Sequence, residues 1–140
     1  MRIRTLVVLF SCICVFSAFS VGPQSDTNGG KELTIKDAEA LVLAALSRET
    51  KRLPGLSLDA APRRGRYITF DVLWNNPGPG TVHVDFYTVD LRSGELWRSI
   101  LCEHVVSRTV ARLQGKLRRR LGISPADVKR AIRDQTGCFP

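Results

Sequence analysis

Residues 67–101 run YITFDVLWNNPGPGTVHVDFYTVDLRSGELWRSIL, and this stretch decides the fold class. Residues 67–74 and residues 81–89 alternate apolar and polar side chains with a period of two. That period is typical of half-buried antiparallel strands, because successive side chains of a strand point to opposite faces. Residues 75–80, NNPGPG, cannot continue either strand, since proline lacks a backbone donor and glycine loosens the chain. Residues 90–95, DLRSGE, predict a tight reversal into a third strand.

A helical pattern precedes this meander. Thr34 and Asp37 have the spacing of a capping box, in which a hydroxyl and a carboxylate satisfy the first backbone donors of a helix. An apolar stripe at helical spacing follows, so we expect a helix from about Ile35 to Thr50. Residues 53–65 contain prolines and glycines, and we interpret them as a connection that packs down through its leucines.

Two more helices are expected after the sheet. From Glu103 the apolar period becomes helical, and Gly122 is placed to end this helix. Ser124 and Pro125 are typical of a new helix start, and we expect that helix to run to about Asp134. The fold class expected is therefore α+β: an N-terminal helix packed on a three-stranded antiparallel meander, followed by two C-terminal helices.

The first residues have the pattern of a targeting segment. Residues 1–20 combine two early arginines with an uncharged apolar run and end in small residues, which predicts a signal peptide. Residues 21–32 are then a flexible leader, and residues 33–140 form a single α+β domain. We expect export to the periplasm or the cell exterior, with no membrane span after cleavage. The alternative is a membrane-anchored protein that keeps its N-terminal segment uncleaved.

The cysteines support export. Cys12 and Cys14 lie in the predicted signal peptide, which leaves Cys102 and Cys138 in the mature chain. An even pair in an exported protein usually forms one disulfide, and the wide spacing argues against a redox-active pair. We therefore predict a disulfide between Cys102 and Cys138.

Two short stretches resemble a known family. Residues 33–46, LTIKDAEALVLAAL, resemble the opening helix of the small exported PepSY domains, and residues 89–96, VDLRSGEL, resemble their closing strand and turn. The topology, a helix packed on an antiparallel sheet, is also similar to cystatin-like domains. This resemblance implies a secreted or membrane-attached protein with a peptidase-inhibitory or regulatory role. The helices after Cys102 depart from the minimal family pattern.

A basic run near the C-terminus suggests a second class of function. The chain carries a formal net charge of +8, and residues 116–120, KLRRR, hold its densest cluster of cations. Arg118, Arg119 and Arg120 are candidate binding residues for a polyanion or a membrane surface. The alternative is a solvated helix face, whose cations favour the negative end of the helix dipole. Nucleic acid is an unlikely partner for an exported protein.

Three polar residues of the strands are candidates for catalysis. If Val72 pairs with Val82, then Asp71 lies opposite His83 and Asp85 lies one step along the diagonal. Such a group could act as a general base or bind a metal, which defines the enzyme alternative. A register shifted by two residues would oppose the two carboxylates and cost stability. An Asp–His ion pair explains the same residues without catalysis, and we predict no metal and no cofactor.

These observations predict an exported, non-catalytic binding module, similar to a PepSY-type inhibitory or regulatory protein. Its partner would be a protein or a peptide, and Asn75 and Asn76 in the Pro-Gly loop are the candidate contact residues. The alternatives are a polyanion- or membrane-surface-binding protein acting through the basic helix, and a small enzyme built on the Asp–His–Asp group.

Overall fold

The computed structural model describes residues 32–75, 78 and 80–133. The predicted signal peptide and most of the predicted leader lie outside them. Among the described residues, no helix is long and apolar enough to cross a membrane. The elements follow in this order: α1 (Ile35–Ala45), α2 (Arg48–Lys51), β1 (Leu56–Ala60), β2 (Tyr67–Asn75), β3 (Thr81–Asp90), β4 (Leu96–Arg98), β5 (Glu103–His104), α3 (Arg108–Leu121) and α4 (Pro125–Arg133).

The strands form one antiparallel sheet in the order β1-β2-β3-β4-β5. The α+β class is confirmed, but the sheet has five strands in the described part of the chain, and the predicted three-stranded meander is only its centre. β1 lies in the segment that we expected to be a connection, where Leu56 and Leu58 alternate with polar residues and pair with β2. β5 has only two residues, too few to show a period in the sequence.

The register between β2 and β3 follows neither expected register along its whole length: from Leu73 to the loop it matches the register shifted by two residues, and from Val72 back to Tyr67 it is displaced by one more residue. Asp71 lies opposite Phe86 and Val72 lies opposite Asp85, whereas Leu73 already lies opposite His83. One extra residue therefore enters β3 between Asp85 and His83, as in a β-bulge. The bulge invalidates a prediction from strict alternation, because every pair beyond it is displaced by one residue.

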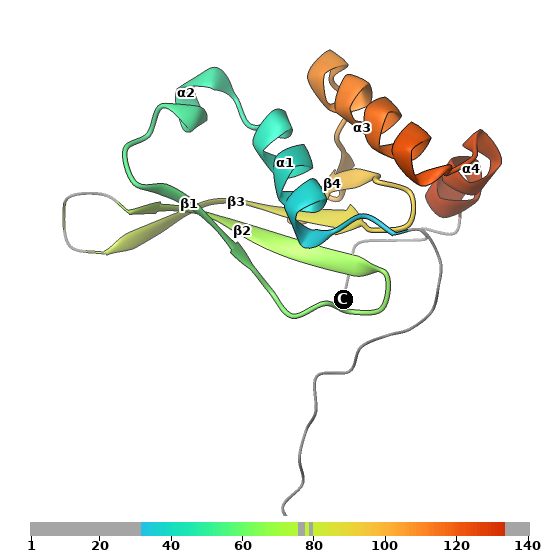
Figure 1. Cartoon of the computed structure of the whole chain (residues 1–140). Helices are drawn as coiled ribbons and strands as arrows, with labels where there is room; N and C mark the ends of the chain where they lie inside the picture. Colours follow the sequence, from blue (N-terminus) through green and yellow to red (C-terminus); the bar gives the residue numbers. More distant parts are fainter. Residues whose placement is uncertain (1–31, 76–77, 79, 134–140) are drawn as a thin grey trace, which may run out of the picture.

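α1 and α3 cover the same face of the sheet and pack against each other (Figure 1). The predicted capping box is present: the Thr34 hydroxyl accepts from the Asp37 backbone, and the Asp37 carboxylate accepts from Thr34. The helix ends at Ala45 and does not reach Thr50, because Ser47 caps the separate short helix α2 with its hydroxyl.

Both predicted C-terminal helices are present, but the first of them begins later than expected. Ser107 caps α3 by accepting from the Val110 backbone, so the helix begins after β5 and not at Glu103. Gly122 adopts the left-handed conformation, with φ 66°, and ends the helix as expected. The Ser124 hydroxyl and the Asp127 carboxylate form the predicted cap of α4.

The core lies between the sheet and the two covering helices. It is formed by buried apolar side chains of β2, β3, β4, α1 and α3, which include Leu41, Val42, Ile68, Phe70, Val72, Tyr87, Val89, Leu96, Val110 and Leu117. Ile35, the first residue of the predicted helix, was expected to begin its apolar stripe but is 55% exposed, so the predicted stripe is partly wrong.

Candidate functional site

The open face of the sheet carries the predicted Asp–His pair. His83 Nδ1 lies 2.7 Å from Asp71 Oδ2, and the His83 ring stacks on Phe86 with centroids 5.6 Å apart. The His83 side chain is 61% exposed and that of Asp71 is 21% exposed. His83 is therefore open to water, whereas the Asp71 carboxylate is mostly covered and its Oδ1 is buried.

Asp85 does not join this pair. It lies opposite Val72, whereas Asp71 lies opposite Phe86, so the two carboxylates belong to neighbouring positions that point to opposite faces. Asp85 Oδ2 accepts from Arg98 Nε at 2.8 Å. The predicted convergence of the three residues is thus wrong, because the bulge in β3 was not visible in the sequence. Among the residues that the structure describes, no group of three or more His, Cys, Asp or Glu could hold a metal ion.

The bond to Arg98 gives Asp85 a role on the helix-covered face. Burial, reinforced by the nearby Asp85 carboxylate, raises the pKa of Tyr87 to about 12. The hydrogen bond with Asp85 raises the pKa of Arg98 above its ordinary value. Both shifts favour a neutral Tyr87 phenol beside a charged Asp85–Arg98 pair.

The β2–β3 hairpin ends in an exposed, partly apolar arm. We define the hairpin arm as Leu73–Asn75 with Thr81–Val84; Val82 is 45% exposed and Val84 is 38% exposed. The Asn75 backbone N–H donates to the Gly55 carbonyl at 3.2 Å, and its side-chain Oδ1 accepts from the Thr81 hydroxyl at 3.1 Å. Asn75 thus connects the two strands of the arm and ties them to the segment before β1. Asn76, the second predicted contact residue, lies outside the described residues.

The predicted arginine cluster is divided among three tasks. Arg118 donates to the Ser93 carbonyl from Nε at 2.7 Å and to the Glu95 carboxylate from a terminal nitrogen. Arg120 donates to Asp37 at 2.6 Å and so ties α3 to the cap of α1. Arg119 has neither role. Its side chain lines a groove between α3 and α4. The basic run is therefore partly structural, and only part of its charge remains for a ligand.

The turn after β3 holds buried charges that sequence reasoning missed. Asp90 is fully buried and accepts from Arg66 at 2.8 Å and from the Ser93 hydroxyl at 2.8 Å. Glu95 is 3% exposed and is paired with both Arg118 and His104. His104 thus lies in β5 as the partner of an acid, and the helix start expected near this residue is wrong. The Ser-Gly-Glu spacing signals a turn but does not show that α3 closes over it.

The predicted disulfide falls partly outside the described residues. Cys102 is disulfide-bonded. Cys138, its predicted partner, is not described, so the pairing of the two cysteines stays a prediction.

The comparisons with known proteins give one informative neighbour. No family model matches the chain, and no curated protein matches it. The PepSY and cystatin-like resemblance therefore stays a prediction. The fold is similar to that of a chain from a solved structure described as a type VI secretion system effector–immunity complex from Pseudomonas protegens. The TM-score is 0.62 at 25% sequence identity, and the match covers 79% of this chain and 94% of the neighbour. At this coarse level the neighbour is consistent with a protein-binding module.

Proposed function

We propose that this chain is the immunity-type member of an effector–immunity pair: an exported, non-catalytic protein that binds a toxic effector and blocks it. The observation that carries the proposal is the likeness to a chain of the Pseudomonas protegens complex, which extends over 94% of that chain. A match of this extent concerns the whole fold, and a shared fold that already serves a protein complex favours a protein partner over a small ligand.

The site geometry favours the immunity role over the effector role. An effector that is an enzyme needs catalytic groups that converge, whereas Asp71 with His83 and Asp85 with Arg98 form separate pairs on opposite faces of the sheet. The His83 side chain is 61% exposed, so a partner protein can reach it directly. The predicted signal peptide would send the protein out of the cytoplasm. An exported immunity protein could bind an effector that acts outside the cytoplasm.

The hairpin arm is our candidate for the contact surface. It lies at the end of the sheet away from α3 and α4 (Figure 1), and it exposes Val82 and Val84 beside polar His83. Exposed apolar side chains rimmed by polar groups are typical of protein–protein contacts. The arm is also held by its two strands and by Asn75, so binding would cost little ordering of the backbone.

The test is capture followed by protection. Mature residues 21–140 are used as bait in the extracytoplasmic fraction of the source, and any retained protein is identified by mass spectrometry. The retained protein is then produced in a host with and without this chain. We expect it to arrest growth alone and to be harmless when this chain is present. A retained protein that is harmless by itself, or one whose toxicity persists, would contradict the proposal.

Matched variants locate the contact. Val82→Glu with Val84→Glu introduces charges on the arm, and we expect the affinity for the captured protein to fall at least roughly tenfold. Ile35→Glu with Leu43→Glu makes the same change at exposed apolar residues of α1, 55% and 39% exposed, outside the arm. Equal losses from both pairs would exclude the arm as the specific contact, while protection by the wild-type chain would still support the immunity role.

A further inference from the structure

A groove between α3 and α4 has the chemistry of a binding site. Its volume is about 410 Å³, and its lining residues are Arg118, Arg119, Ile123, Pro125, Val128 and Lys129. This volume lies within the range of ordinary ligand pockets, roughly 300–1,000 Å³. Apolar side chains form its walls, and three cations surround them, so a ligand must offer both apolar surface and negative charge.

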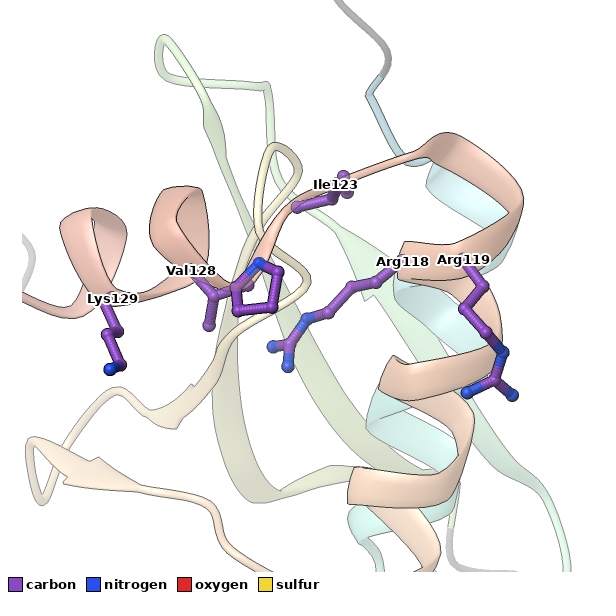
Figure 2. Close-up of a pocket in the computed structure, with 6 residues that line it drawn as sticks. Arg118, Arg119, Ile123, Val128 and Lys129 are labelled. Carbon is purple, nitrogen blue, oxygen red and sulfur yellow. The ribbon is translucent and has the colours of Figure 1, made fainter.

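The three cations differ in how free they are. Arg118 is paired with the Glu95 carboxylate and donates to the Ser93 carbonyl. It therefore forms part of the groove wall but adds little net positive charge. Among the residues that the structure describes, Arg119 and Lys129 form no ion pair, and both side chains are exposed. In the view of Figure 2 they lie on the two flanks of the groove, with Arg118 and Val128 between them. The groove therefore has Arg119 and Lys129 at opposite sides of a centre that holds Val128 and the ion-paired Arg118 (Figure 2).

The surroundings add to this positive field. Residues 108–133 contain nine Lys or Arg and one Asp. A cleft lined by one sign of charge raises the local concentration of ligands of the opposite sign. The positive field and the apolar walls together favour a negatively charged ligand that also carries apolar groups.

We propose that this groove binds an acidic segment of the protein partner, in which acidic residues flank an apolar one. The apolar side chain packs on Ile123, Pro125 and Val128, and the flanking carboxylates pair with Arg119 and Lys129. The charge complementarity favours an acidic ligand, and the concave apolar wall favours a protein segment over a lipid headgroup, which would meet the cations without filling the wall. The proposal rests on the proposed function for the identity of the partner but not for the chemistry of the groove.

A peptide titration tests the groove directly. The probe is Ac-Glu-Leu-Leu-Glu-NH2, added to isotope-labelled mature protein and followed by NMR. We expect saturable shifts centred on Ile123 and Val128. Ac-Glu-Gly-Gly-Glu-NH2 should bind at least roughly tenfold more weakly because it lacks the apolar contact. Equal affinity for both peptides, or shifts spread over the whole basic surface, would overturn the proposal.

Charge reversal supplies the matched control. Arg119→Glu with Lys129→Glu should weaken the probe at least roughly tenfold, since two attractive pairs become repulsive. Arg112→Glu with Arg133→Glu makes the same change at exposed cations of the same two helices outside the groove, and the affinity should stay within about twofold. Circular dichroism checks that all variants fold. If both double variants lost affinity for the peptide equally, attraction by net charge alone would explain binding, and the proposed site would be overturned.

Two further measurements separate the possible ligands and the two proposals. Vesicles of phosphatidylglycerol and phosphatidylcholine should not compete with the probe; vesicle binding that depends on Arg119 and Lys129, without peptide binding, would assign the groove to lipid and overturn our inference. The captured protein should lose affinity with the groove variants. If it binds and protects unchanged, the groove proposal fails while the immunity role stands. If no effector is captured but the peptide binds as described, the groove stands without the immunity role.

Discussion

At the scale of single residues, the turn between β3 and β4 depends on buried carboxylates that are all paired. Asp90 is held by Arg66 and Ser93, and Glu95 is held by Arg118 and His104. A buried charge is costly unless opposite charges and hydrogen bonds compensate it. Because Arg118 comes from α3 and His104 from β5, Glu95 joins the turn after β3 to two later elements of the chain. Loss of Glu95 should therefore destabilise the whole domain.

The prediction for Glu95 uses an exposed acid as its control. Glu95→Ala leaves Arg118 without its carboxylate, and we expect the free energy of unfolding to fall by about 2–3 kcal/mol, since Arg118 keeps some access to water. Glu103→Ala removes an acid whose side chain is 61% exposed and lies 3.5 Å from Arg98, and it should cost less than about 1 kcal/mol. Urea denaturation measures both. Equal losses would show that burial of Glu95 is not what matters.

Tyr87 makes stability depend on alkaline pH. Burial and the nearby Asp85 carboxylate raise the pKa of Tyr87 to about 12 in the folded protein, whereas a tyrosine of an unfolded chain ionises near 10. Below about pH 10 Tyr87 is neutral in both states, and the stability of the folded protein is fully retained. As the pH rises from about 10 to 12, ionisation of the tyrosine in the unfolded chain lowers the free energy of unfolding. We expect Tyr87→Phe to lose less stability than wild type over that range. Parallel pH profiles of unfolding in the two proteins would contradict the assignment.

These residues also mark a limit of sequence reasoning. The spacing of Asp90, Ser93 and Glu95 correctly indicated a turn. Their burial could not be predicted, because it depends on Arg66 and Arg118, which lie far away in the sequence. The Asp71–His83 contact was expected and is present, but it arises across a bulge and not from the register that suggested it.

At the scale of elements, predictions succeeded where a local chemical signal marks an end. The caps of α1 and α4 were visible as Thr34–Asp37 and Ser124–Asp127. The break after Ala45 was missed because the apolar stripe gives no sign that Ser47 will cap a second helix. β1 was missed for a different reason: a short strand with two leucines on one face resembles any packed connection, and only pairing with β2 distinguishes it.

The cap of α1 gives a test at this scale. Thr34→Ala removes a hydroxyl that accepts from the Asp37 backbone, and we expect the free energy of unfolding to fall by about 1 kcal/mol. The control is Thr109→Ala, an exposed threonine inside the first turn of α3, where alanine should be neutral or slightly stabilising because it favours helix more strongly. Denaturant midpoints decide the point. A loss at position 109 as large as that at Thr34 would argue against capping.

At the scale of the whole molecule, the two proposed contact surfaces lie far apart. The hairpin arm extends from one end of the sheet, whereas α3 and α4 lie at the other (Figure 1). Residues 108–133 of the helical end carry nine Lys or Arg and one Asp, whereas the arm carries exposed valines. A partner that uses both must span the length of the domain and must itself offer an acidic patch and an apolar pocket, which makes recognition specific without any single strong contact.

The separation predicts additive losses of binding. Residues that share no contacts and lie more than roughly 7–10 Å apart usually contribute independently, within about 0.5 kcal/mol. We therefore expect the binding energy lost in the combined variant, Val82→Glu with Val84→Glu and Arg119→Glu with Lys129→Glu, to equal the sum of the losses in the two parent variants. Calorimetric titration of the captured effector measures all three. A combined loss smaller than the sum by more than about 1 kcal/mol would mean that the partner engages the arm and the groove in alternative poses, and the single extended interface would then be wrong.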